Sequence, residues 1–144
     1  PGGAVAGRRD LMELLAGTIA HPGTFNANPL SAAAGIATLK IVMDGTQQRA
    51  ADGYARTLEE EWRSALEASA VSGRIWRLSS IVHIALDDPE QQNRLGDALR
   101  DEGVDLLHTS AFCSSAHSLS DLDQSISAFT RALSRLAMTA VSSA

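Results

Sequence analysis

The spacing of apolar residues constrains this chain most, because it changes from helical to strand-like between residues 50 and 86. In the first half of this region apolar side chains recur every four residues, as on one face of an α-helix ending near Ala70. In the second half they are dense and largely β-branched, which is typical of strands. The polar pair Ser79 and Ser80 divides the second half, so we expect two short strands or one bent strand. The helical stripe consists of Ala50, Tyr54, Leu58, Trp62 and Leu66.

Two proline residues, each preceded by a short polar residue, mark the starts of two further helices. Such a polar side chain can accept hydrogen bonds from the first free backbone N–H groups, and proline suits the first helical position. Asn28-Pro29 predicts a helix that runs to about residue 42, and Asp88-Pro89 predicts a second one. The first helix is rich in alanine, so we expect it to pack closely inside the protein or at a subunit contact.

Shorter signals complete the first part of the chain and the region after the second capped helix. Residues 3–7 are apolar with several glycines and predict a short buried strand, which is followed by a helical turn that ends at Gly17. Residues 104–107 predict another strand, and the serine-rich residues 108–118 predict a loop with at most a short strand.

A last amphipathic helix follows this loop. Ser118 with Asp121, or Ser120 with Asp123, offers a capping box at its start. The alternation of helices and strands along the chain predicts the α/β class. The inward stripe of the last helix consists of Leu122, Ile126, Phe129, Leu133 and Leu136.

Charge and composition exclude some classes of partner. The formal net charge is -5, with both signs scattered along the chain, which disfavours nucleic acid. No apolar run approaches the roughly 20 residues of a membrane-spanning helix, so we expect no membrane partner. The single cysteine, Cys113, fits a reducing compartment, and we expect a cytoplasmic protein. The first residue is Pro1 and not methionine, which indicates that the sequence starts within a longer chain.

A thiol and imidazoles in the predicted loop are candidates for chemistry. Cys113 and His117, with His108 nearby, could form a nucleophile pair or part of a metal site. Two histidines and one cysteine are too few for a closed zinc site, so we favour a polar loop and expect no metal. His83 lies within the strand region, and we interpret it as a hydrogen-bonded structural residue.

The only lysine of the sequence, Lys40, lies near the end of the first capped helix. A lysine that forms a Schiff base needs a desolvated pocket that lowers its pKa. Nothing in the sequence around Lys40 predicts such a pocket. We therefore expect Lys40 to lie on the surface.

Gly23 and Thr24 form a candidate phosphate site. Glycine lets a backbone approach a ligand closely, threonine offers a hydroxyl and a backbone N–H, and a helix begins a few residues later. On these residues alone, an ordinary loop before a capped helix remains the alternative.

Several motifs give the chain a resemblance to a known family. Residues 23–39, which read GTFNANPLSAAAGIATL, resemble the Gly-Thr, Gly-Asn-Pro-Leu, Ala-Ala-Gly stretch of class III aminotransferases. The similarity is greatest to the glutamate-1-semialdehyde 2,1-aminomutase-like members of that family. Residues 3–8, 102–104 and 116–118 also resemble family segments, in the family's order.

The resemblance implies an α/β fold, namely the C-terminal part of the type I fold of pyridoxal-phosphate-dependent transferases. Residues 1–44 would be the end of the large cofactor-binding domain with an interface helix, and residues 45–144 an α+β small domain. The family implies the cofactor pyridoxal 5'-phosphate, small amino and carbonyl substrates, and a homodimer with active sites at the subunit interface. Gly23 and Thr24 would bind the phosphate of the cofactor of the neighbouring subunit.

Two departures and one absence limit the resemblance. Ala27 stands where the family usually has glycine, and residues 112–115 are compressed and polar beside the family pattern. The Schiff-base lysine of the family lies upstream of the position of Pro1, so no catalytic residue is assigned and the chain alone should be inactive. The alternative is a non-catalytic fragment or degenerate domain that retains only an interaction surface.

Overall fold

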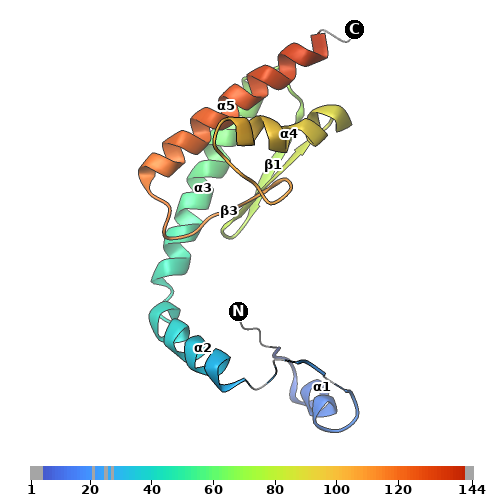
Figure 1. Ribbon diagram of the computed structural model, residues 1–144, viewed down its shortest axis with the longest axis vertical. Coiled ribbons are helices and arrows are strands. Elements are labelled where there is room, and N and C mark those ends of the chain that lie inside the picture. The colour runs from blue at the N-terminus through green and yellow to red at the C-terminus, as the bar shows by residue number, and fades with distance from the viewer. Residues whose placement is uncertain (1–4, 21, 25, 27, 142–144) are drawn as a thin grey trace. The chain divides into compact units, whose positions relative to one another are not determined.

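A computed structural model describes residues 5–20, 22–24, 26 and 28–141, drawn in Figure 1. The chain separates into two compact units, Pro1–Asp44 and Gly45–Ala144. The assignment of these units to the large and small domains of the family stays a prediction.

The first unit begins with a short helical segment. Helix α1, Arg9–Met12, continues as the 3-10 helix η1, Glu13–Ala16, and ends at Gly17 as predicted. The buried strand predicted over residues 3–7 is wrong for the part of it that is described, since residues 5–7 have no regular structure and Val5 is 61% exposed. A strand needs a hydrogen-bonded neighbour, and none of the described strands pairs with this segment. Residues 3 and 4 lie outside the described residues.

Helix α2, Pro29–Val42, has the predicted boundaries. The Oδ1 of Asn28 accepts hydrogen bonds from the backbone N–H groups of Leu30 at 2.9 Å and Ser31 at 3.2 Å. Pro29 needs no such partner because it lacks an N–H group. Local capping chemistry therefore fixes the start of this helix.

The second unit begins with helix α3, Thr46–Glu67, which follows Gly45. Gly45 has a φ of 75°, in the left-handed region that glycine adopts without steric cost. The predicted stripe is confirmed at Leu58, Trp62 and Leu66, whereas Ala51 and Ala55 are buried in place of Ala50 and Tyr54, and Tyr54 is half-buried. Steps of four residues drift by about 40° each around a helix with 3.6 residues per turn, so Ala50 has left the face centred on Leu58. The buried residues of α3 are Ala51, Ala55, Leu58, Trp62 and Leu66.

The sheet has three antiparallel strands in the order β1-β2-β3. β1, Gly73–Leu78, and β2, Ile81–Leu86, form the hairpin predicted around Ser79 and Ser80. β3, Ser110–Phe112, pairs with β2 and lies within the predicted loop.

The strand predicted over residues 104–107 is wrong. The chain reverses directly after Leu107, in a tight turn where His108 has a φ of 57°, and Leu107 forms only an isolated bridge with Ser110. Beyond this one bridge to the edge strand β3, residues 104–107 form no ladder with a described strand. Their apolar side chains pack against the core instead, as Val104 and Leu106 do.

The remaining two helices both start with side-chain caps. The Oδ1 of Asp88 accepts a hydrogen bond from Glu90 N–H at the start of α4, Pro89–Asp101. At the start of α5, Leu119–Val141, Ser118 N–H donates to Asp121 Oδ2 at 2.7 Å and Asp121 N–H donates to Ser118 Oγ at 3.2 Å. Of the two predicted capping boxes, the structure thus forms the one between Ser118 and Asp121.

The core of the second unit lies between the sheet and its helices, with α3 and α4 on the sheet and α5 against both (Figure 1). The indole of Trp62 stacks on the ring of Phe129, with ring centroids 4.8 Å apart. Its Nε1–H donates a hydrogen bond to the carbonyl of Ser125 at 3.1 Å. Both rings are fully buried, so α3 and α5 are joined at the centre of the core.

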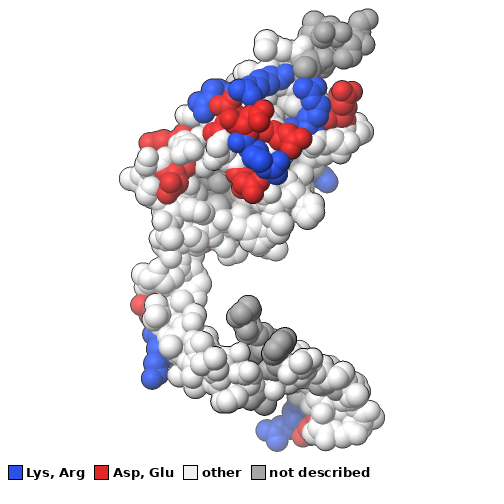
Figure 2. All heavy atoms as spheres, in the orientation of Figure 1, with Lys and Arg blue, Asp and Glu red and all other residues white. Residues whose placement is uncertain are grey.

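Charged side chains cover the junction of α4 and α5, where Figure 2 shows both signs interspersed. Glu102, at the end of α4, pairs with Arg131 and Arg135 of α5. The arginines hold the pKa of Glu102 below its usual range. Because the arginines are half exposed, these pairs orient the helices more than they stabilise the fold. None of the described helices is both long and apolar enough to cross a membrane.

Replacing Phe129 by alanine should lower the free energy of unfolding by about 3 to 5 kcal/mol, because the ring is fully buried and its removal leaves a cavity in the core. Urea denaturation followed by far-ultraviolet circular dichroism measures the loss. Leu119→Ala is the matched control on the same helix, since Leu119 is 78% exposed and should change stability by less than about 0.5 kcal/mol. Equal effects of the two substitutions would contradict the assigned core.

Candidate functional site

The predicted phosphate pair, Gly23 and Thr24, lies in a turn that precedes α2. The backbone N–H of Asn26 donates to the carbonyl of Gly23 at 3.0 Å, which closes the turn. Thr24 is the second residue of this turn and is exposed. The hydrogen bond that closes the turn does not use the backbone N–H of Thr24. Both groups of Thr24 are hydrogen-bond donors, as a phosphate requires.

Gly23 allows this turn to close tightly. A Cβ atom at Gly23 would lie 2.5 Å from Oδ1 of Asn26, closer than real Cβ atoms approach an oxygen. Any other residue would therefore push the side chain of Asn26 away. The missing Cβ of Gly23 thus makes room for the side chain of Asn26, which packs on the backbone of the turn.

The start of α2 is engaged by its own cap. Asn28 Oδ1 already accepts hydrogen bonds from Leu30 N–H and Ser31 N–H, so these two donors are occupied in the described structure. Thr24 is therefore the better candidate anion contact in this segment. Ala27, a departure from the family pattern, lies outside the described residues. The role of Gly23 and Thr24 in binding a phosphate stays a prediction.

Helix α2 presents its apolar side chains to solvent. Lys40 is exposed in the last turn, as expected from the sequence, and Thr38 Oγ1 donates to the carbonyl of Ala34 at 2.9 Å. The predicted packing of this helix against another surface stays a prediction, and its composition still favours it. The exposed fractions are 79% for Leu30, 57% for Ile36, 64% for Leu39 and 67% for Ile41.

Cys113 does not have the properties of a nucleophile. It is 9% exposed, and burial raises the pKa of its thiol to about 11. The thiolate is the reactive form of cysteine, so at neutral pH the side chain is the unreactive thiol.

His117 is engaged elsewhere and does not activate Cys113. Its Nδ1 accepts a hydrogen bond from the backbone N–H of Ser114 at 3.2 Å, so this nitrogen is not available to take a proton from a thiol. The ring packs on Tyr54, with centroids 5.1 Å apart. Among the residues that the structure describes, no group of three or more His, Cys, Asp or Glu side chains could hold a metal ion.

His83 has the predicted structural role. Its Nδ1 forms a hydrogen bond with Ser110 Oγ at 2.9 Å, and its ring stacks on Trp76 with centroids 5.2 Å apart. These contacts join the three strands on the outer face of the sheet. His108, by contrast, lies in the tight turn before β3, where it has a φ of 57°. Histidine is one of the few residue types other than glycine that are enriched at positive φ.

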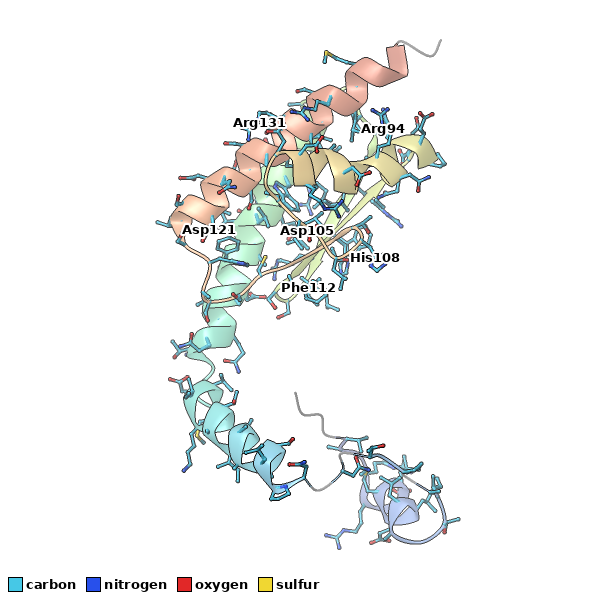
Figure 3. The ribbon with its side chains drawn as sticks, in the orientation of Figure 1. Arg94, Asp105, His108, Phe112, Asp121 and Arg131 are labelled. Carbon is cyan, nitrogen blue, oxygen red and sulfur yellow. The ribbon has the colours of Figure 1, made fainter. Side chains whose placement is uncertain are left out.

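One feature of the second unit was not predicted from the sequence. A hollow of about 240 Å³ lies between α3, residues 103–106 and the loop that leads to α5, and Cys113 and His117 are among its lining residues. Tyr54, Asp105 and Asp121 also line it, and Figure 3 labels the two aspartates and Phe112. The sequence pattern predicts Tyr54 in the apolar stripe of α3 and Asp121 in the cap of α5. No local pattern indicates that three such distant segments meet.

Comparison with known proteins now identifies the family. The sequence profile described as "Aminotransferase class-III" matches residues 1–136. The chain belongs to the class III aminotransferases. This confirms the resemblance found in the sequence motifs.

Curated relatives of this class III aminotransferase chain include several glutamate-1-semialdehyde 2,1-aminomutases. The one from Methanocaldococcus jannaschii is 37% identical over 95 residues, which cover 65% of this chain and 22% of that relative. The one from Hyperthermus butylicus is 29% identical over 154 residues, which cover 94% of this chain and 36% of that relative. The one from Thermomicrobium roseum is 30% identical over 156 residues, which cover 95% of this chain and 36% of that relative. The chain thus spans about a third of their length or less.

Solved structures of similar fold are transaminases. One described as "Transaminase with PLP bound" superposes with a TM-score of 0.81 at 20% identity, over 93% of this chain and 35% of that one. An omega-transaminase from Sphaerobacter thermophilus superposes with a TM-score of 0.77 at 20% identity, over 90% of this chain and 34% of that one. These superpositions confirm the predicted α/β fold of pyridoxal-phosphate-dependent transferases for this class III aminotransferase.

We predict that iodoacetamide labels Cys113 at pH 8 about 10- to 100-fold more slowly in the folded chain than in urea. A raised pKa lowers the thiolate fraction at this pH, and the rate should increase with pH up to about 11. Mass spectrometry of the labelled peptide follows the reaction, with the urea-unfolded chain as control. Equal rates in the folded and unfolded chains at pH 8 would show that Cys113 is neither buried nor perturbed.

Proposed function

We propose that this chain is the C-terminal portion of an enzyme that uses pyridoxal 5'-phosphate to move an amino group. The reaction is either a transfer between an amino acid or amine and a carbonyl compound, or a shift within one molecule. The family match over residues 1–136 is the observation that carries this proposal. Relatives named as aminomutases and similar structures named as transaminases support both forms of the reaction.

The residues of this chain fit one part of the cofactor, its phosphate. When bound, pyridoxal phosphate supplies an electron sink for the bonds at the carbon that carries the amino group. The hydroxyl and backbone N–H of Thr24 would hold the phosphate, and Gly23 would allow the tight turn that presents Thr24. Lys40 is exposed in this chain, so none of the described groups of the chain desolvates it as a Schiff-base lysine requires. By the family resemblance, that lysine precedes the position of Pro1 in the complete enzyme.

We also propose that the enzyme is a cytoplasmic homodimer with its active sites at the subunit interface. The exposed apolar residues of α2, among them Leu30 and Ile41, support this, because such a helix gains stability when another surface covers it. Gly23 and Thr24 of one subunit would then contact the cofactor of the other. The single buried thiol, Cys113, supports a reducing compartment.

A segment exchange tests the proposal. In the Hyperthermus butylicus aminomutase, the aligned 36% of the length is replaced by this chain, and we expect the chimaera to bind pyridoxal phosphate and to move amino groups. Thr24→Ala in the chimaera should weaken cofactor retention about 10- to 100-fold. A hydroxyl hydrogen bond to a charged phosphate contributes about 1.5 to 3 kcal/mol, which corresponds to this loss. Equilibrium dialysis with cofactor absorbance measures the affinity.

Two substitutions control this experiment. Thr24→Ser keeps the hydroxyl and should restore retention, whereas Thr38→Ala removes a hydroxyl that bonds within α2 and should leave retention unchanged. Unchanged retention in Thr24→Ala would remove Thr24 from the site. A folded chimaera that binds no cofactor would count against the enzyme itself and in favour of the alternative below.

The alternative is a non-catalytic fragment or degenerate domain that keeps only an interaction surface. The exposure of Lys40, the only lysine of the sequence, favours this reading for the chain on its own.

With pyridoxal phosphate at low concentration and borohydride, we expect the isolated chain to show no stoichiometric modification of Lys40 by peptide mass spectrometry. The physical reason is that a solvated lysine is not activated towards the cofactor carbonyl. Complete modification of Lys40 under these conditions would contradict its assignment as a surface residue. Bovine serum albumin or another protein with exposed lysines, treated in parallel, gives the background level.

A further inference from the structure

The hollow in the second unit, which we call the Tyr54 pocket, has a floor of buried apolar side chains. Trp62 is fully buried beneath it, Leu58 is 3% exposed and Ala111 is 9% exposed. Its volume of about 240 Å³ exceeds the roughly 150 Å³ of a cavity that holds one benzene ring. The pocket can therefore take a flat apolar group of phenyl size with a short substituent.

Aromatic rings form part of the wall of the Tyr54 pocket. Tyr54 and Phe112 line it, together with the imidazole of His117 that packs on Tyr54. Burial raises the pKa of the Tyr54 hydroxyl, so this side chain is neutral near pH 7. A neutral tyrosine ring attracts a cation placed over its face and offers a hydroxyl for hydrogen bonding.

The formal charges at the pocket are negative. Its lining includes the carboxylates of Asp105 and Asp121, and among the described lining residues there is no lysine or arginine. Asp105 is offset by Arg100, whose Nη2 lies 3.1 Å from Asp105 Oδ1. Asp121 instead accepts hydrogen bonds from two neutral groups, the backbone N–H and the hydroxyl of Ser118, and the nearby imidazole of His117 lowers its pKa further.

The charge of Asp121 is therefore the one that decides which ligands the pocket favours. Hydrogen bonds from Ser118 lower the pKa of Asp121, so the carboxylate stays ionised at neutral pH. A carboxylate beside a low-polarity floor attracts a cation and repels an anion of the same shape.

We propose that the Tyr54 pocket binds a small arylalkyl amine as its ammonium cation. The aromatic body of the amine would lie over Trp62 and Leu58, and the ammonium group would lie towards Asp121 and the face of Tyr54. This site is separate in sequence and in residue content from the Gly23 and Thr24 pair, so it goes beyond the proposed function. Its occupation requires no cofactor.

Benzylamine is a suitable probe, and Trp62 at the pocket floor reports on it. The sequence has two tryptophans, so Trp76→Phe leaves Trp62 as the only indole in the 144-residue chain. We expect a saturable change in Trp62 fluorescence with a dissociation constant in the millimolar range, about 10⁻³ M. Benzoate has the same ring and the opposite charge, and it should bind at least about tenfold more weakly than benzylamine.

Substitutions then locate the charge. Asp121→Asn should weaken benzylamine binding about two- to fivefold, as expected for a partly exposed ion pair. Asp123→Asn removes an exposed carboxylate of the same helix that does not line the pocket, and it should leave binding unchanged. Asp121 also belongs to the cap of α5, so circular dichroism first establishes that the variant is folded.

The comparison of the two ligands in the chain with native Asp121 does not depend on that variant. Equal affinities for benzylamine and benzoate would overturn the proposal. So would the absence of a saturable response at benzylamine concentrations up to about 50-fold above the expected dissociation constant. Equal effects of Asp121→Asn and Asp123→Asn on benzylamine binding, in folded variants, would overturn it as well. Saturable binding of benzylamine with weak binding of benzoate supports it. Shifts of backbone amide resonances around Tyr54 and Asp121 would confirm the location.

Discussion

The packing of Trp62 against Phe129 is the contact on which the second unit depends. The indole joins α3 to α5 by stacking, and its N–H reaches the carbonyl of Ser125, so its one polar group is satisfied inside the core. A buried N–H without a partner would cost about 1 to 3 kcal/mol, which makes this rotation of the two helices preferable to others. The same rotation brings Tyr54, about two turns before Trp62, and Asp121, about one turn before Ser125, to the edge of one hollow. A core contact thus determines the geometry of a surface pocket.

Local chemistry explains why so much of the helical structure was predictable. The starts of α2 and α4 follow from Asn28 and Asp88, whose side chains bond to backbone groups two or three residues away. The hairpin of β1 and β2 likewise follows from dense apolar residues on both sides of a short polar break. In each case the sequence neighbourhood contains the interacting partners, so pattern and outcome agree.

The wrong predictions concern elements whose existence depends on distant partners. Residues 104–107 have strand composition, yet the chain reverses at His108 and leaves them one bridge, from Leu107 to Ser110, in place of a ladder. The same holds for the described residues 5–7, beside which no described strand lies. The Tyr54 pocket was not predicted, for a related reason. Its lining comes from α3 and from segments that follow about 50 residues later, and sequence patterns report only on near neighbours. The Gly23 and Thr24 pair was found through motif resemblance, and the turn that presents Thr24 became visible only in the structure.

The two units differ in how their order is maintained, and this difference bears on the proposed cofactor site. The second unit has its own core, whereas none of the described residues of the first unit is buried. The turn around Thr24 is closed by the hydrogen bond from Asn26 to Gly23, and the neighbouring helix α2 exposes its apolar side chains. Covering α2 would therefore stabilise the segment that carries Thr24, and a phosphate bound at Thr24 would stabilise the same segment. Because a ligand stabilises the state that binds it, assembly and cofactor retention are expected to reinforce each other in the proposed enzyme.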